Sequence, residues 1–513
     1  MDSSQLVIRF AKRFFAGTLL SRISGAFRDI AMAICFGSAP EIGAFMVAYR
    51  FANLFRRLLG DGSLQAGFIP HFSSLQEKES LYFYRDCTFS LTSFLLFIIL
   101  CLEGILWGIS HFFSNDWKAI ISLSMRMLPG LLFICLYALN SAFLQTQKKY
   151  FLSGFAPVLF NLCWIIAALF ASFLPLNKAM EFLSFGITIA FILQWAVTLL
   201  QTRQFVSLSW GEWLRPQIFS LELKKMIKPI SLGVIGVGAT QLNSALDAIF
   251  SRISDLSGPA YLWYAIRVEQ LPLALFGIAL SGALLPPLSR AIVDGAIDRY
   301  SALLNKALHA SAILIVPCTF GLLALGGPGL NLLYGHGDFS PLDVQQTLYC
   351  LWGYGLGLLP SVMILLMASS FYAKKTYTVP TIASLTSVVF HTVLTSFLVF
   401  GLHLGAFSIA ISTSIAAFVN CSVLVYYSKI NLHLDLWKFF GRIIFCGLSA
   451  AIATIYVGYA FLGDVTFTDA TFTRSFSRQC MQLLCMGSLF CSVFVGSCYA
   501  LGIRWNQKEQ ELV

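Results

Sequence analysis

Two groups of charged residues interrupt apolar stretches of the chain, and over the two groups together arginines outnumber acids. The first lies within residues 22–61 and the second within 247–269. An ionisable side chain inside a membrane-spanning helix costs roughly 2.5–3.5 kcal/mol on insertion scales, so it normally faces a polar cavity or a charged partner. The planar guanidinium group forms two parallel, charge-assisted hydrogen bonds to a phosphate. The excess of arginine therefore predicts a cavity for an anion, and several converging arginines would suit a diphosphate.

Arg22 and Arg28 lie on either side of Gly25 in the first predicted helix. A glycine beside Ser24 allows a local break, and a break would turn both guanidinium groups toward one cavity. The alternative is an ion pair between Arg28 and a nearby acid such as Asp29, made only for structure. Isolated pairing does not explain two arginines so close together, so we favour the cavity.

The second predicted helix carries Arg50, Asn53 and Arg57 at the spacing i, i+3 and i+7, which is one stripe of a helix. Arg56 lies on the adjacent face. Because Arg56 and Arg57 are close to the predicted cytoplasmic end, they could also be an ordinary basic flank with snorkelling side chains. Asp61 then ends the helix and could be a simple turn residue.

Arg267 begins the eighth predicted span, with Tyr264 and Gln270 three residues to either side on the same helical face. Pro272 and Gly277 follow, so we expect this helix to be bent. A bent helix that carries a cation beside a cavity predicts a ligand contact.

The acidic residues of both groups are predicted to support the arginines. Asp29 and Glu41 would offset part of the positive charge, so that the site releases its ligand. Asp247 and Arg252 could form a counter-ion pair at the outer end of the seventh span.

The composition identifies the class of protein that must position these residues. The chain has 513 residues, of which 58% are hydrophobic and 11% charged, and its mean hydropathy is +0.77. These values are typical of a polytopic, all-α membrane protein. The net charge of +10 then indicates cytoplasmic loops and anionic lipid, not nucleic acid. No nucleophile, cofactor motif or metal-ligand spacing is apparent, so we predict neither an enzyme nor a cofactor.

Apolar stretches of the length that crosses a bilayer can be placed about fourteen times. The predicted spans are 12–36, 42–60, 86–110, 119–145, 153–173, 179–201, 224–250, 259–288, 305–326, 344–371, 378–400, 403–427, 437–462 and 477–502. Lysine and arginine concentrate in alternate loops, which predicts that both termini are cytoplasmic. The opposite loops hold only Lys118, Lys178, Arg252, Arg474 and Arg478.

The first twelve predicted spans divide into two sets of six. An acid, an arginine and a Pro-x-x-Ser sequence recur in order, as Asp29, Arg50 and 70–73 and again as Asp247, Arg267 and 286–289. We therefore predict a parallel repeat of two six-helix lobes around a central cavity. The lobes are 1–203 and 224–430, with a cytoplasmic linker at 204–223 and two additional helices within 431–513.

Two motifs give the chain a family resemblance. The first is Ser21-Arg22-Ile-Ser-Gly25-Ala-Phe-Arg28-Asp29, followed by Phe36-Gly37, Ala44–Arg50, Asn53–Leu58, Asp61-Gly62 and Ala66–Pro70. The second is Tyr264-Ala-Ile-Arg267, followed by Leu271-Pro272, Phe276–Leu280 and Leu284–Arg290. In these residues, and in span number and orientation, the chain resembles the MurJ/MviN lipid II flippases.

The resemblance implies membership of the multidrug/oligosaccharidyl-lipid/polysaccharide exporter superfamily and a location in the bacterial inner membrane. It also implies a cargo, the undecaprenyl-diphosphate-linked disaccharide-pentapeptide from which peptidoglycan is built. By motif position, the residues that would contact this cargo in the central cavity are Arg22, Arg28, Arg56 and Arg267. The two additional helices would form a groove for the lipid tail. Partners among cell-wall synthesis or division proteins are conceivable but not readable from the sequence.

The chain departs from the family pattern at three positions. Gly43 stands where the family usually has an aspartate, Ala52 where it has a proline, and Asp61 where it has a glutamate. Glu41 replaces the missing charge but not its position, which puts a gating role of that acid in doubt.

Three other functions are alternatives to lipid II transport. An exporter of drugs or cations on the same fold would have acids in excess in its cavity, the reverse of this pattern. A non-transporting scaffold for envelope assembly would tolerate neutralisation of the four arginines one at a time. A flippase for a different polyprenyl-linked glycan is a further alternative. No recognisable ion site in the sequence indicates the energy source.

Overall fold

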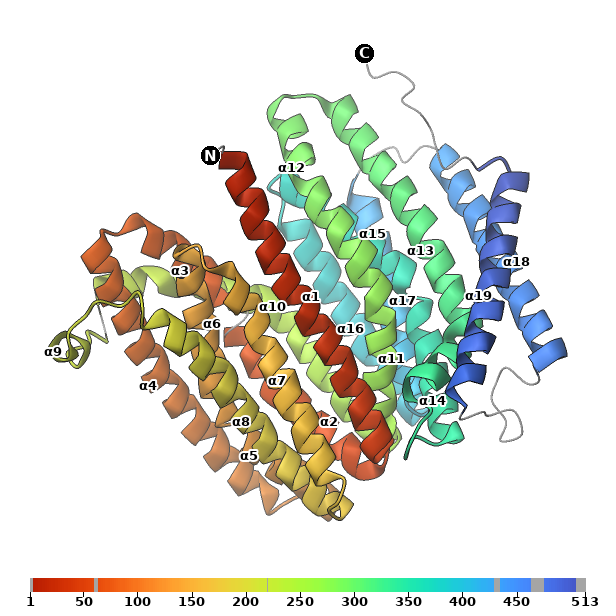
Figure 1. Cartoon of the computed structure of the whole chain (residues 1–513). Coiled ribbons are helices and arrows are strands. Elements are labelled where there is room, and N and C mark those ends of the chain that lie inside the picture. The colour runs from red at the N-terminus through yellow and green to blue at the C-terminus, as the bar shows by residue number, and fades with distance from the viewer. Residues whose placement is uncertain (1–2, 60–62, 219, 429–433, 463–474, 504–513) are drawn as a thin grey trace. The chain divides into compact units, whose positions relative to one another are not determined.

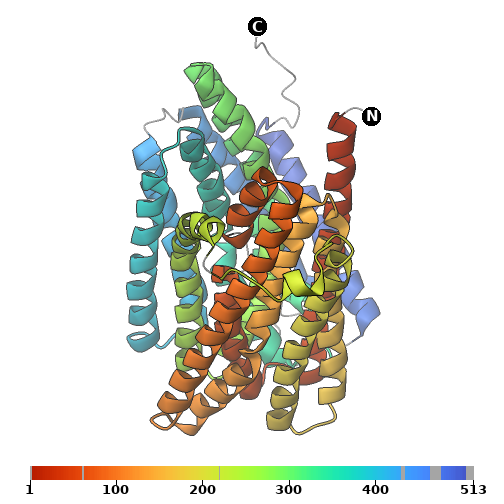
Figure 2. The same cartoon turned by 90° about the vertical axis from the view of Figure 1, so that its left-hand side faces the viewer.

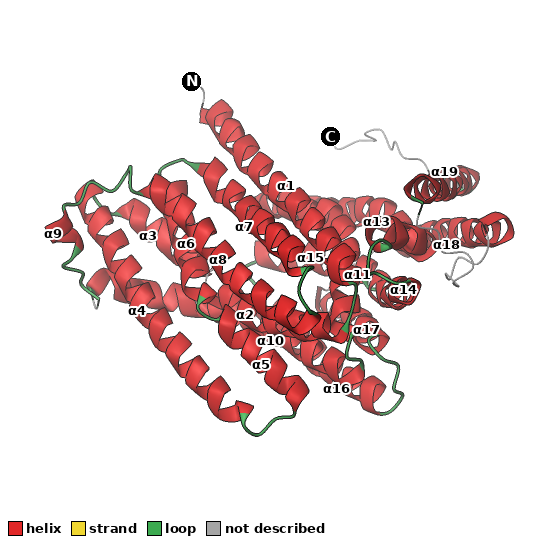
Figure 3. Ribbon diagram, turned by 60° about the horizontal axis from the view of Figure 1, so that its bottom comes forward, coloured by secondary structure: helices red, strands yellow, loops and turns green. Residues whose placement is uncertain are grey.

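The computed structural model describes residues 3–59, 63–218, 220–428, 434–462 and 475–503. Within these ranges every regular element is a helix (Figure 3). Among the described residues, ten helical segments are long and apolar enough to cross a membrane. An eleventh results if the helices Asn115–Met127 and Gly130–Thr146, which meet at 41°, form one span. The chain is therefore an all-α, multi-pass membrane protein. The count of fourteen spans and the internal repeat stay predictions.

The chain forms two compact units, Met1–Arg252 and Ile253–Val513. The helices of unit 1 are α1 (Ser3–Phe36), α2 (Pro40–Leu59), α3 (Ser63–Ser74), α4 (Glu77–Ser110), α5 (Asn115–Met127), α6 (Gly130–Thr146), α7 (Tyr150–Ala171), α8 (Leu176–Thr202), α9 (Trp210–Trp213) and α10 (Leu221–Ser254), which ends just beyond it. The helices of unit 2 are α11 (Gly258–Pro272), the π-helix η1 (Leu273–Ile278), α12 (Ala279–Val293), α13 (Ile297–Tyr334), α14 (Pro341–Gly355), α15 (Leu358–Ala373), α16 (Thr378–Phe400), α17 (Phe407–Ser428), α18 (Leu434–Leu462) and α19 (Phe476–Ala500).

Helices α1 and α2 correspond to the first two predicted spans but are absent from the apolar set. Each carries more charge than the members of that set, because α1 has Arg22, Arg28 and Asp29 close together and α2 has one acid and three arginines. Side chains of this kind need protein or water around them. The two helices are joined by a tight turn in which Gly37 adopts a φ of 59°, a conformation that favours glycine.

Helix α1 lies along α7, and this pair holds the first arginines in place (Figure 1). The two backbones approach so closely at Gly17 that a Cβ there would lie 3.0 Å from backbone atoms of residues 151–155. Small residues allow such close packing of membrane helices. Helix α1 runs without interruption through Gly25, so the local break that we expected at this glycine does not occur.

In unit 2 the predicted bend in the eighth span takes the form of a π-helical turn. Pro272 ends α11, and η1 follows before the chain returns to α-helix at Ala279. Proline has no backbone N–H to donate, so it loosens the helical hydrogen-bond ladder. A Cβ at Gly277 would lie 2.8 Å from a methyl group of Val362, so this glycine lets η1 pack tightly on α15.

The last two helices pack on α13 of unit 2 and on each other. A side chain at Gly447 of α18 would collide with the ring of Phe320 in α13. Phe490 and Phe494 of α19 are buried in the same core. Both helices are thus integral parts of unit 2.

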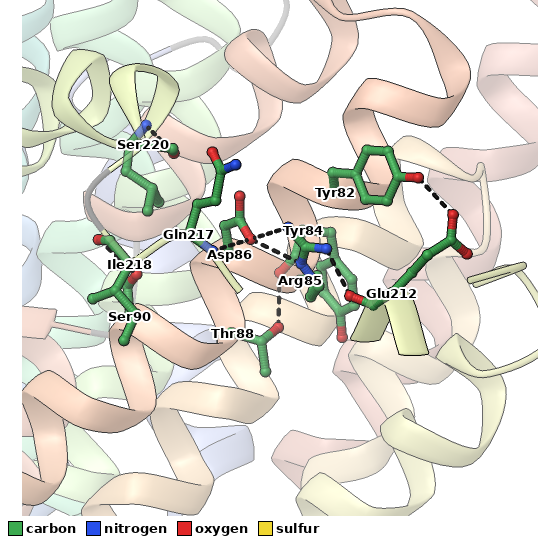
Figure 4. A network of polar contacts seen from close by, with 11 residues as sticks. Tyr82, Tyr84, Arg85, Asp86, Thr88, Ser90, Glu212, Gln217, Ile218 and Ser220 are labelled. Carbon is green, nitrogen blue, oxygen red and sulfur yellow. Dashed lines mark hydrogen bonds and ion pairs between the residues drawn. The ribbon is translucent and has the colours of Figure 1, made fainter. Parts of the chain in front are cut away.

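The segment between α8 and α10 is fixed to α4 by a polar network (Figure 4). Arg85 and Asp86 form a buried ion pair of 2.7 Å, Arg85 donates to the carbonyl oxygen of Glu212, and the N–H of Gln217 donates to Asp86. The third predicted span begins at residue 86, just after Arg85, but α4 begins at Glu77 and encloses this residue. The linker is therefore a docked element.

Glu212 should titrate at unusually low pH because of this docking. The Tyr82 hydroxyl donates a 2.6 Å hydrogen bond to its carboxylate, and that bond, with weaker contributions from Ser209, lowers the pKa of Glu212 from 4.5 to about 2. A depressed pKa stabilises the docked state above pH 4.5, and this contribution is lost as the pH falls through 2. The infrared band of the Glu212 carboxylate is the one that Glu212→Gln lacks. We expect this band to disappear near pH 2 in the wild type and at higher pH in Tyr82→Phe. Identical titrations in both proteins would contradict this role of Tyr82.

Candidate functional site

Arg28 is buried within unit 1, where all three guanidinium nitrogens make hydrogen bonds. Nε and Nη2 donate to Asp29 Oδ1 at 3.0 and 2.7 Å, and Nη1 donates to Asn161 of α7 at 3.1 Å. The guanidinium carbon lies 4.6 Å from the centre of the Trp164 ring. Arg28 and Asp29 are only 7% and 3% exposed. In this conformation Arg28 thus joins α1 to α7.

The amide of Asn161 connects this ion pair to the backbone of α1. Its Nδ2 donates to the carbonyl oxygen of Ser21 at 3.1 Å and to the Ser24 hydroxyl at 2.9 Å, while its Oδ1 accepts from Arg28. Asn161 lies far along the sequence from these residues, and nothing in its surroundings marked it as a partner. It is the polar group of the site that sequence reasoning missed.

Arg22 is exposed, in contrast to Arg28. Because α1 is a continuous helix, residues six positions apart project about 120° from each other. Arg22 and Arg28 therefore lie on different faces of α1. Without a break, this helix does not turn both guanidinium groups toward one cavity. Within Ser21–Asp29, Arg22 has an exposed side chain and Arg28 a buried one.

Helix α2 has the polar stripe that its spacing predicted, because it is continuous from Pro40 to Leu59. Arg50, Asn53 and Arg56 are half-buried and Arg57 is exposed. Arg50 interacts electrostatically with Asp247 of α10, which is buried. The stripe therefore combines a charge facing another helix with a charge facing outward. Asp61 lies outside the described residues.

Glu41, in the first turn of α2, lines a polar pocket of about 350 Å³. Arg252 lines the same pocket and donates a 2.6 Å hydrogen bond to the carbonyl oxygen of Pro40. Arg126 and Glu181, which are 3.4 Å apart, form another part of the wall. Glu41 therefore shares this pocket with two arginines and with the acids Asp116 and Glu181. The Asp247–Arg252 pair stays a prediction.

Arg267 of α11 is half-buried, and its guanidinium carbon lies 4.2 Å from the centre of the Trp263 ring. The two residues are four apart, the spacing at which helical side chains meet. Stacking on an indole orients a guanidinium without using its N–H donors. Gln270 is exposed, but Tyr264 is fully buried against Tyr334, so it belongs to the core and not to a ligand-facing stripe.

The family model described as "Lipid II flippase MurJ" matches residues 32–480. The chain belongs to the MurJ lipid II flippase family. Arg56 and Arg267 lie inside the matched region, whereas Arg22 and Arg28 precede it.

Bacterial relatives match over most of their length. The chain is 30% identical over 473 residues to a protein of Chlamydia pneumoniae named "Probable lipid II flippase MurJ", covering 91% of this chain and 86% of that one. It is 30% identical over 515 residues to the protein of the same name in Chlamydia trachomatis serovar D, covering 96% and 94%. The "Lipid II flippase MurJ" of Burkholderia cenocepacia is 30% identical over 378 residues, or 71% and 72%.

Solved structures share the fold. A "Lipid II flippase MurJ, inward closed conformation" superposes with a TM-score of 0.76 at 24% identity, covering 96% of this chain and 99% of that one. An inward-facing multidrug resistance MATE transporter of the MOP superfamily gives a TM-score of 0.61 at 13% identity, covering 82% and 95%. The chain thus shares its fold with both of these proteins.

Proposed function

We propose that this chain is a lipid II flippase of the bacterial inner membrane. It would move the undecaprenyl-diphosphate-linked peptidoglycan precursor from the cytoplasmic to the outer face without making or breaking a bond. The family match over most of the chain carries this proposal. The arginines on α1, α2 and α11 support it, because a diphosphate is an anion that arginine binds through paired hydrogen bonds.

In the proposed mechanism, two six-helix lobes alternate between inward-open and outward-open states. The headgroup enters from the cytoplasm, where both termini would lie. Its diphosphate meets Arg22, Arg28, Arg56 and Arg267, with Asp29, Glu41, Arg50, Asn53, Arg57, Asp61 and Gln270 in supporting or gating roles. The polyprenyl tail stays in lipid, along the groove that we assign to α18 and α19. Rocking of the lobes then exposes the headgroup outside.

Complementation tests the function directly. The chain is expressed in bacteria depleted of their own lipid II flippase, and lipid II at the outer face is measured with an impermeant probe. We expect rescue by the wild type. Arg22→Ala should lower outer-face lipid II by roughly tenfold or more, because a hydrogen bond to a charged group contributes about 1.5–3 kcal/mol.

The control is Arg299→Ala, which removes another exposed arginine, at the start of α13. It should rescue as well as the wild type. A wild type that inserts but fails to rescue would favour a different polyprenyl-linked cargo or a scaffold. Full rescue by the Arg22, Arg56 and Arg267 single variants would argue against anion transport.

A further inference from the structure

A groove of about 630 Å³ lies on unit 1, apart from the arginine site. Helix α6 packs against both α4 and α8 and forms the floor between them; α4 is orange and α8 yellow in Figure 2. The apolar lining is Phe89, Leu132, Phe133, Leu136, Trp195 and Leu199. None of the four predicted cargo-binding arginines lines it.

Two tryptophans of the linker and one arginine at the end of α8 close one end of this groove. Trp210, Trp213 and Arg203 line that end, and Trp210 is 79% exposed. The buried pair of Arg85 and Asp86 holds this part of the linker in place (Figure 4). The linker follows the end of α8, which is long and apolar enough to cross a membrane. We therefore expect its tryptophans near the membrane surface, where this residue is enriched.

The closed end of the groove is electropositive. Arg203 is exposed, and the ammonium group of Lys149 lies 5.8 Å from the centre of the Phe205 ring, two residues further on. The nearby acids are each paired with a cation, since Glu212 lies 3.6 Å from the ammonium group of Lys78 and Asp86 is paired with Arg85. An anionic group at the end of the groove would therefore meet a positive potential at the membrane surface.

The remaining length of the groove is apolar and runs toward the hydrocarbon. On α4 it extends from Tyr84 to Thr92, a rise of about 12 Å at 1.5 Å per residue. Water has few polar partners on such a surface, whereas an acyl chain fills it without losing hydrogen bonds. The ligand that matches both ends has an anionic head and an aliphatic tail.

We propose that this groove is a binding site for one anionic phospholipid. The headgroup contacts Arg203 beside the docked linker, and an acyl chain lies on α6 between α4 and α8. The site is separate from cargo transport, so it should be occupied whether or not the chain moves lipid II.

Native mass spectrometry of the purified full-length chain tests the proposal. Dioleoyl phosphatidylglycerol and dioleoyl phosphatidylcholine are titrated separately, and bound lipid is counted for each. We expect phosphatidylglycerol to bind about fivefold more tightly, as one basic residue near the membrane surface provides. Arg203→Gln should remove this preference and leave phosphatidylcholine binding unchanged. Thr92→Trp, which places a ring in the groove from a half-exposed position, should weaken binding of both lipids.

Arg299→Gln is the matched control, because it removes an exposed arginine of unit 2. Equal binding of the two lipids by the wild type, or the same loss in Arg203→Gln and Arg299→Gln, would overturn the proposal. A phosphatidylglycerol with a photoreactive acyl chain gives a second test that needs no variant. Crosslinks should fall on Thr92, Leu136 and Leu199, and crosslinks confined to other helices would refute the site.

Discussion

Replacing Arg28 with alanine is expected to abolish rescue and to destabilise the protein. The substitution leaves the carboxylate of Asp29 buried without its guanidinium partner and removes the hydrogen bond to Asn161. Breaking a buried ion pair in this way costs about 3–5 kcal/mol. We expect a clear fall in the unfolding temperature in detergent, alongside loss of outer-face lipid II.

A second substitution separates the structural role of Arg28 from a role in cargo binding. In Arg28→Ala/Asp29→Asn the orphaned charge is gone, so the unfolding temperature should recover much of its loss. Outer-face lipid II should stay low if Arg28 also binds the diphosphate during transport. Rescue by the double variant would mean that the ion pair serves structure alone, which is the alternative that the sequence left open.

Neutralising Arg267 should lower transport more than any other single substitution of an exposed or half-buried side chain in unit 2. Its guanidinium is stacked on Trp263 and is held in one orientation by that contact. Arg267→Ala is expected to lower outer-face lipid II by roughly 10–100-fold, because each charge-assisted hydrogen bond contributes about 1.5–3 kcal/mol. The folded amount of the variant should match the wild type, since the side chain is only half-buried.

Arg267→Lys distinguishes a phosphate contact from a general need for positive charge. Lysine keeps the charge but offers a compact ammonium in place of the planar fork, so transport should be intermediate. Arg290→Ala, at an exposed position near the end of α12, should transport normally. Equal transport by the alanine and lysine variants, with both close to the wild type, would remove Arg267 from the site.

The family and the membrane class could both be predicted from the sequence. Hydropathy places apolar spans because their length is fixed by the bilayer, whatever the tertiary packing. The motifs around Arg22 and Arg267 are local strings of residues, and their match needs no coordinates. The polar stripe of Arg50, Asn53 and Arg57 was also predictable, because helical spacing alone sets it.

The relation between Arg28 and its surroundings was decided only by the tertiary structure. The neighbouring acid was visible in the sequence, but Asn161 comes from α7 and reaches Arg28 through the packing of α1 on α7. The expectation of a break at Gly25 failed for the same reason. A glycine permits a break but does not require one, and close packing against α7 keeps α1 straight.

The linker shows the same division. The third predicted span starts just after Arg85, because charge usually marks the end of a span. In the folded chain Asp86 and the linker carbonyl oxygen of Glu212 accept hydrogen bonds from Arg85, so α4 extends past it. The sequence determined which segments are apolar, and its arginines indicated that the ligand is an anion. Tertiary structure alone decided where each buried charge finds its partner, because those partners lie on other helices.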